Sequence, residues 1–415
     1  MPNKGALIKF LLFNWLNRHN RMVPMTDRAV KEMQSHPVLF HGSGAEFFKI
    51  WAVNLLLSLV TLGIYSAWAK VRTQRYFYGS TELDGDRFEY LAEPLRILKG
   101  RIIALLYVVV TGILYHVSAA GALAVWALTA ALAPLLLRAS LRFNCRVTRF
   151  RGVRFDFVGS LGGIYWSVLG RPLMLVLLLI PASAVMVMMG ELESLGATFI
   201  GVIAIMLAYG AGLGWMMRGS ALYSIRGLRY GEHAFDVDLS MQTYLRVMGV
   251  SALIWLVVMG APLLLFLMGY GYAGLVMSDL NLLKEGQVPD SSLFVGVAMV
   301  LYGGAVAAGA LSWLYQHVTL RNYLFNQTRL GEGIAFKSAM TLPGYGALLV
   351  SNTLLLIFSA GVMRPWVMVR SARYQLECTR VEGELALLAH DRAEAANSAV
   401  GDEMVEALDL DLGLI

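Results

Sequence analysis

The stretch that decides the fold is residues 54–88, NLLLSLVTLGIYSAWAKVRTQRYFYGSTELDGDRF, an apolar run that ends in cationic and aromatic residues and continues into a polar turn. The same pattern returns near the C-terminus at a constant offset. The matched pairs are Asn54 and Asn352, Gly63 and Gly361, Trp68 and Trp366, Arg72 and Arg370, Arg75 and Arg373, and Tyr76 and Tyr374. The chain therefore contains an internal repeat that relates its first and last apolar segments.

The composition is that of an integral membrane protein. Hydrophobic residues make up 57% of the chain and charged residues only 15%, against about 25% charged residues in soluble domains. Uncharged runs reach the roughly 20 residues that a helix needs to cross a bilayer. The 34 Lys and Arg residues are explained by membrane edges, so we predict no nucleic-acid partner.

Apolar runs predict six central spans and two apolar end segments. The six spans cover residues 102–119, 121–137, 172–189, 197–217, 247–269 and 294–316, and the end segments cover 47–69 and 345–369. Around them we predict three regions. These are a basic N-terminal segment with a possible interfacial helix over 1–41, a polytopic membrane domain over 42–381 and an acidic C-terminal tail over 382–415.

A second repeat lies between the spans: an aromatic residue, Thr or Leu five positions later, and then Gly. The five copies are Tyr76-Thr81-Gly85, Phe143-Thr148-Gly152, Tyr223-Leu228-Gly231, Tyr323-Thr328-Gly331 and Tyr374-Thr379-Gly383. An aromatic residue follows the glycine in the first four copies only, at Phe88, Phe155, Phe235 and Phe336. Asp84-Gly85 is typical of a tight hairpin turn. We therefore predict an all-α polytopic membrane protein with short β-hairpins that form a small β layer.

The charge distribution predicts that these hairpins are cytoplasmic. Lys and Arg concentrate in the connections that carry the repeat, whereas the opposite connections contain only Lys284. The end segments leave two alternatives open. Each is a plain span, giving eight in all, or each is re-entrant, with breaks at Gly63, Gly361 and Pro365.

Several of these motifs together resemble the YjgN-type family of bacterial inner-membrane proteins. They are TLGIYSAWAKVR (61–72), RYFYGSTELDGDRFEY (75–90), FHGSG (40–44) and LDLGL (410–414). The resemblance covers most of the chain. It implies a multi-pass protein of the bacterial inner membrane that carries a domain of unknown function, and it implies no catalytic residue and no chemistry.

The residues themselves predict no enzyme activity, no cofactor and no metal site. The six predicted spans contain no Asp, Glu, Lys or Arg, which disfavours an ion-coupled transporter. No arrangement of a nucleophile or of metal ligands is recognisable. What remains is a candidate rim that binds lipid headgroups or other anions, formed by Arg72, Arg75, Tyr76, Arg138, Arg142, Arg370, Arg373 and Tyr374.

Two interpretations of this rim stay open. Arg72 and Arg75 share a helix face. In the first interpretation they together hold a lipid phosphate or a hairpin carboxylate such as Glu82 or Asp84. In the second they only anchor the helix. At the level of the whole protein, the first hypothesis is a permease- or channel-like helix bundle. The alternative is a structural or lipid-interacting scaffold, with membrane lipids as partners. A cavity at mid-membrane depth would favour the first, and a solid interior with a basic rim would favour the second.

Overall fold

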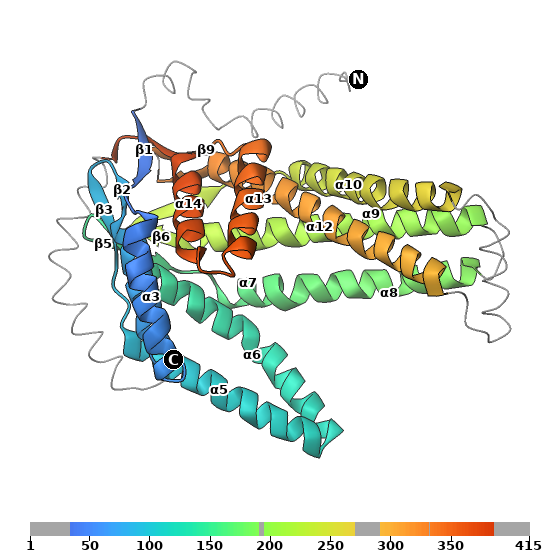
Figure 1. Cartoon of the computed structure of the whole chain (residues 1–415), viewed down its shortest axis with the longest axis horizontal. Helices are drawn as coiled ribbons and strands as arrows, with labels where there is room; N and C mark the ends of the chain where they lie inside the picture. Colours follow the sequence, from blue (N-terminus) through green and yellow to red (C-terminus); the bar gives the residue numbers. More distant parts are fainter. Residues whose placement is uncertain (1–33, 191–194, 270–290, 332, 386–415) are drawn as a thin grey trace, which may run out of the picture.

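The computed structural model describes residues 34–190, 195–269, 291–331 and 333–385. Within these ranges a small closed β-barrel lies at one end of the molecule, and long helices extend away from it (Figure 1). The predicted interfacial helix near the N-terminus and nearly all of the predicted acidic tail lie outside the described residues.

The barrel is a ring of short antiparallel strands, each paired with its neighbours in the chain, and the ring closes where β1 meets β10. The strands are β1 (Ser35–Phe40), β2 (Thr81–Leu83), β3 (Asp86–Tyr90), β4 (Thr148–Phe150), β5 (Val153–Phe157), β6 (Leu228–Tyr230), β7 (His233–Val237), β8 (Thr328–Leu330), β9 (Ile334–Ser338) and β10 (Thr379–Gly383).

Short turns connect β2 to β3, β4 to β5, β6 to β7 and β8 to β9 at one end of the barrel. At the opposite end, the connections between strands are made of helices. The helices are α3 (Gly44–Val60), α4 (Ser66–Gly79), α5 (Pro94–Val117), α6 (Ala119–Arg146), α7 (Leu161–Tyr165), the π-helix η1 (Trp166–Gly170), α8 (Arg171–Gly190), α9 (Leu195–Arg226), α10 (Met241–Gly269), α12 (Ser291–Gln327), α13 (Leu342–Phe358) and α14 (Arg364–Glu377). The repeating unit is therefore strand, helix pair, strand, which we call a module. Five modules run from β1 to β2, β3 to β4, β5 to β6, β7 to β8 and β9 to β10.

The predicted fold class is wrong. The protein is not all-α with six central transmembrane helices, because it contains a closed ten-stranded barrel. In the part of the chain that the structure describes, five helices are long and apolar enough to cross a membrane, within Pro94–His116, Ala119–Arg146, Leu161–Pro181, Met241–Gly260 and Ala298–Gln327. Strands of three to six residues give a weak periodic signal, which the long apolar runs conceal.

Both end segments fold back as helical hairpins. The first breaks between α3 and α4, where Leu62 and Gly63 adopt positive φ, and the second breaks at the equivalent Ala360 and Gly361. Positive φ is readily available to glycine, which explains the repeated Gly at this turn. Neither segment is a single straight helix. Re-entrance concerns the position in a membrane and stays a prediction.

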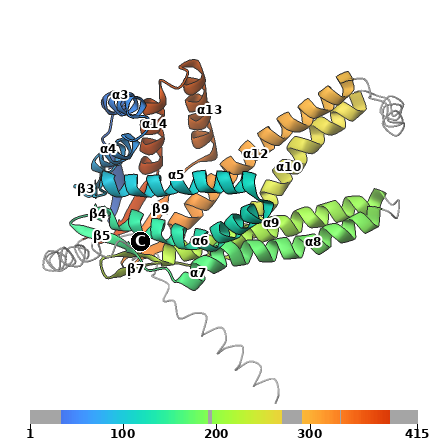
Figure 2. The same cartoon turned by 90° about the horizontal axis from the view of Figure 1, so that it is seen from below.

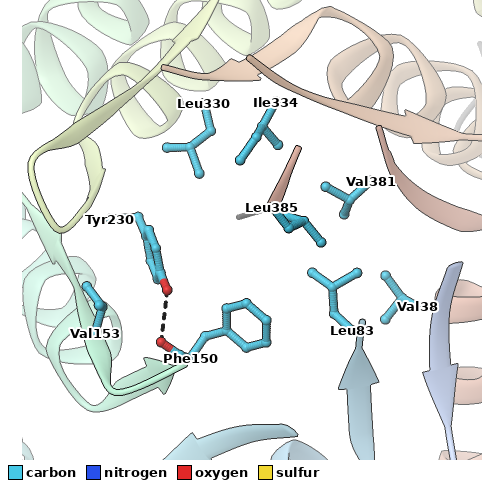
Figure 3. Close-up of a cluster of buried hydrophobic side chains, with 9 residues drawn as sticks. All are labelled: Val38, Leu83, Phe150, Val153, Tyr230, Leu330, Ile334, Val381 and Leu385. Atoms are coloured by element: carbon cyan, nitrogen blue, oxygen red, sulfur yellow. Dashed lines mark hydrogen bonds between the residues drawn. The ribbon is translucent and has the colours of Figure 1, made fainter. Parts of the chain in front are cut away.

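The barrel interior is filled by apolar side chains (Figure 3). Inward-facing residues from all sides of the ring, together with Leu385 just beyond β10, form this core: Val38, Leu83, Phe150, Val153, Tyr230, Leu330, Ile334, Val381 and Leu385. The Tyr230 hydroxyl donates to the Phe150 carbonyl at 2.9 Å. The four repeated aromatics Phe88, Phe155, Phe235 and Phe336 pack against the same core. A packed interior of this kind is a core, not a pore.

The fifth repeat copy ends after β10 and, within the described ranges, has no second strand of its own hairpin. Strand β1 pairs with β10 in that place. The cross-strand partner of Phe88 is Phe150, and in the same register the partner of Val38 is Leu83. Val38 therefore occupies the inward position that a phenylalanine occupies on β3, β5, β7 and β9. Strand β1 lies inside the predicted basic N-terminal segment 1–41, and the sequence pattern does not mark it because its inward residue is not aromatic and Pro37 interrupts the strand pattern.

The long helix pairs separate from one another as they leave the barrel. The pair α10 and α12 diverges from the pair α8 and α9 (Figure 2), and α5 with α6 forms a third branch (Figure 1). Their apolar faces are largely exposed, and none of the apolar window of α5 is buried. Bilayer lipid is the solvent that such surfaces require.

Candidate functional site

Three of the predicted rim residues lie on the second helix of a module, near the barrel. Arg75, Arg138 and Arg373 all donate hydrogen bonds to a backbone carbonyl just beyond the neighbouring strand. Their acceptors occupy one register position in three different modules: Ala92 at 3.4 Å, Gly159 at 2.6 Å and Gly42 at 2.8 Å. The remaining two modules use Arg218 on Leu239 and Asn322 on Met340, at 2.7 and 2.8 Å. This ring of donors fastens helices to strands.

The repeated tyrosine has an equally structural place. The backbone N–H of Ser43 donates to the Tyr76 hydroxyl at 2.7 Å, and that hydroxyl donates to the Ser43 carbonyl at 2.9 Å. Burial raises the pKa of Tyr76. The same contact recurs between Tyr223 and Ser160, Tyr323 and Ser240, and Tyr374 and Thr341.

The second module lacks both residues of this tyrosine contact, which supports a structural role for the tyrosine. It has Phe143 in place of the tyrosine, and Glu93 stands where the other modules have Ser or Thr before the outgoing helix. The two ends of the contact thus change together within one chain. The aromatic position of the repeat is explained by helix anchoring in four modules and by packing in the other.

Arg72 and Arg370 lie apart from this ring, on the outer helical hairpins, and both are exposed. Arg72 contacts the Asn54 side chain at 3.3 Å and the Tyr65 hydroxyl at 3.2 Å. Arg370 donates to the Ser351 hydroxyl at 3.0 Å. These two equivalent arginines therefore have only uncharged side-chain partners in the part of the chain that the structure describes.

Arg142 lies on α6, beside strand β5 of the barrel. It approaches the carboxylate of Asp156 at 3.7 Å, where Arg146 is closer at 3.0 Å. Burial alone would raise the pKa of Asp156, but hydrogen bonds from the Phe157 backbone and from Arg146 outweigh it, so the pKa is lowered. This carboxylate is ionised and paired with α6.

Arg72 and Arg75 have different partners within the protein. Arg72 contacts Asn54 and Tyr65, whereas Arg75 donates to the carbonyls of Tyr90 and Ala92. The hairpin carboxylates have other partners. Glu82 accepts from His41 at 2.9 Å, and Asp84 contacts Arg151 and His36. Among the described residues the two guanidinium groups therefore share no partner, and joint binding of a lipid phosphate stays a prediction.

Arg151 is the residue that sequence reasoning missed at the turn end of the barrel. Its side chain is only 11% exposed and donates to Asp84 at 2.7 Å, Asp86 at 2.6 Å and the Leu385 carbonyl at 3.1 Å. We call these contacts the Arg151 network. The hydrogen bond from Arg151 holds the pKa of Asp84 below its usual value. The network connects the β2–β3 turn, the β4–β5 turn and Leu385 at the turn end of the barrel.

The described residues contain no group of three or more His, Cys, Asp or Glu that could hold a metal ion. Two hollows of 310 and 540 Å³ lie against barrel strands, one beside Arg75 and Glu89 and the other beside Asp156 and Arg229. Neither is lined by the apolar part of a candidate span. The distinctive chemistry of the described region is therefore cationic and lies where helices meet the barrel.

Comparisons with known proteins agree with the membrane character of the helices. The family model described as "Bacterial protein of unknown function (DUF898)" matches residues 35–407. The chain is 27% identical to the inner membrane protein YjgN of Salmonella typhimurium, over 86% of this chain and 90% of that protein. It is 25% identical to the inner membrane protein YjgN of Escherichia coli strain K12, over 85% and 90%. No solved structure matches the chain.

Proposed function

The chain belongs to the DUF898 family, and on that premise we propose that it is a non-enzymatic scaffold of the inner membrane that holds anionic lipid around its helix pairs. The observation that carries this proposal is a filled barrel joined to helix pairs with exposed apolar faces. Ile103, Leu136 and Leu177 are 60–68% exposed. Lipid chains would cover these faces, and the adjacent arginines would attract anionic headgroups.

The orientation is part of the proposal. We propose that the barrel faces the cytoplasm, because the connections rich in Lys and Arg lie at its end of the helices. The cytoplasmic leaflet is the one whose surface carries anionic lipid. The basic residues near the barrel would then lie beside anionic lipids, which they are suited to bind.

A permease or channel is the second candidate. It is supported by the five-module repeat, since many transporters are built from internal repeats. The apolar core closes the route through the barrel, so a transported molecule would have to pass between helix pairs and leave beside the barrel. Solute flux in proteoliposomes, compared with empty liposomes, distinguishes this candidate from the scaffold.

Lipid analysis tests the scaffold proposal. We expect protein extracted with its surrounding bilayer by an amphipathic polymer to be enriched in phosphatidylglycerol and cardiolipin by about fivefold, because each arginine near an anionic surface contributes about 1 kcal/mol. Mass spectrometry of the retained lipid, compared with lipid from the same membranes, gives this ratio. A retained composition equal to that of the bulk membrane contradicts the proposal.

Cysteine labelling in intact cells tests the orientation. In a chain with Cys145→Ala and Cys378→Ala, we expect Arg87→Cys to react with a maleimide only after the membrane is permeabilised, because Arg87 is an exposed barrel residue. Ser118→Cys is the matched site, exposed in the turn between α5 and α6. It should react in intact cells. The reverse labelling pattern would place the barrel outside.

A further inference from the structure

Two arginines of the third module lie at the barrel-side ends of the apolar stretches that the sequence predicts as spans 172–189 and 197–217. Arg171 is the first residue of α8, and residues 172–190 beyond it contain no Asp, Glu, Lys or Arg. Arg218 follows a stretch of α9, residues 195–217, that likewise contains none of them. Each stretch is about 30 Å long at 1.5 Å per residue. With these apolar stretches across the bilayer, both guanidinium groups would lie at lipid-headgroup depth.

The Arg171 side chain is held in a defined position. Its guanidinium lies over the ring of Trp215, 5.5 Å from the centroid, and its Nη1 donates to the Ser167 hydroxyl at 3.1 Å. Ser167 belongs to η1, the π-helical turn that directly precedes α8, and such turns occur frequently at functional sites. Both ring stacking and the hydrogen bond restrict the guanidinium before any ligand arrives.

Gly219 provides the space that the guanidinium occupies. A Cβ atom built on Gly219 would lie 1.9 Å from Cζ of Arg171, so any other residue there would displace the cation. The glycine is itself buried against this side chain. The absence of a side chain at residue 219 is thus a condition for the observed position of Arg171.

The charge of this site is uncompensated. Arg218 directly precedes Gly219, whose backbone lies against the Arg171 guanidinium, so the two positive charges lie near each other. In the ranges that the structure describes, no carboxylate forms an ion pair with either residue, and the buried Nε of Arg171 has no hydrogen-bond partner. Arg218 uses its Nε on the Leu239 carbonyl at 2.7 Å, which leaves its terminal nitrogens available. An anion between the two side chains would relieve the repulsion.

We propose that Arg171 and Arg218 together bind a phosphate group, as a lipid headgroup or as free phosphate. A phosphate offers several oxygens to two planar guanidinium forks, which bind it with directed, charge-assisted hydrogen bonds. The lipid form rests on the proposed function above and adds a specific site to it. The apolar stretches that start at both arginines would hold the acyl chains of that lipid.

The test uses delipidated full-length protein in neutral detergent and measures the shift in unfolding temperature with added ligand. The three probes are short-chain phosphatidylglycerol, short-chain diacylglycerol without the phosphate, and inorganic phosphate. We expect phosphatidylglycerol but not diacylglycerol to stabilise the wild type. Gly219→Ala and Arg171→Gln should weaken this response about tenfold or more in concentration, since bonds to charged groups are lost.

Gly249→Ala is the matched control, because a Cβ there meets nothing within 4 Å. It should respond as wild type does. Gly219→Ala keeps both charges, so its loss of response cannot come from a change in net charge, and Arg171→Gln covers the case in which that variant folds poorly.

The outcomes separate the site from the function. If phosphatidylglycerol stabilises all four proteins equally, the lipid-binding function stands and this site is wrong. If inorganic phosphate alone stabilises the wild type, and the two site variants lose that response, the site stands and its ligand is free phosphate, against the lipid function. If neither phosphatidylglycerol nor phosphate stabilises the wild type, both proposals are wrong.

Discussion

Val38→Lys should prevent the barrel from closing. Val38 is 6% exposed and points from β1 into the core among Leu83, Val381 and Leu385. An ammonium group without a partner in this apolar interior would cost about 4 kcal/mol or more. Since β1 is the strand that joins the two ends of the ring, we expect little monodisperse protein after detergent extraction and rapid proteolysis at the barrel turns.

Leu39→Lys is the control in the same strand. Leu39 is 43% exposed, points outward and lies opposite Glu82. The equivalent position on β9 is Lys337, so the module accepts a lysine there. This variant should be extracted and should unfold like the wild type. Equal damage from the two substitutions would mean that β1 does not alternate between core and surface as the register requires.

Arg151→Met should destabilise the turn end of the barrel by about 2–4 kcal/mol, because it removes a nearly buried cation from two carboxylates and two backbone carbonyls. Arg149→Met is the matched control, because Arg149 lies two residues before Arg151, on β4. Arg149 is 35% exposed and contacts only Glu89 across the surface, so its loss should cost less than about 1 kcal/mol. Unfolding temperatures in one detergent rank the two variants, and an equal decrease would rule out a special role for Arg151.

The pH dependence of stability provides a second measurement on this network. Hydrogen bonding by Arg151 lowers the pKa of Asp84 from its usual 3.8 in the folded protein. A lowered folded pKa stabilises the protein above the unfolded value, and that stability is lost as the pH falls through the folded pKa. The gap in unfolding temperature between wild type and Arg151→Met should therefore be constant near neutral pH and should narrow below about pH 4. A gap that widens on acidification would contradict this origin.

The repeat made much of the barrel readable from the sequence. Gly85 and Gly152 adopt positive φ together with the residues before them, Asp84 and Arg151, as hairpin turns require. The repeated phenylalanines mark inward positions on four strands. The sequence did not reveal closure, because β1 pairs with residues more than three hundred positions away and carries Val38 where the pattern has phenylalanine.

The site was harder to predict than the barrel. Arg75 and Arg373 were recognised as functional candidates from type and spacing, yet their partners are backbone carbonyls, which leave no trace in side-chain identity. Arg171 and Arg218 looked like ordinary ends of spans. Their relation depends on the close approach of two helices and on the space at Gly219, and neither follows from local sequence pattern.

The seam between β1 and β10 also sets an order of events during synthesis. Four neighbouring module pairs are joined by short turns, but this fifth seam has no covalent link and forms between the first and last strands of the ring. At about 5–20 residues per second, the ribosome needs roughly 20–70 s to make the chain between them. During that time the free edge of β1 is exposed beside the membrane, where an unpaired edge invites association. The first strand of the ring is therefore made long before its partner β10, and the ring can close only after all the intervening helices have been synthesised.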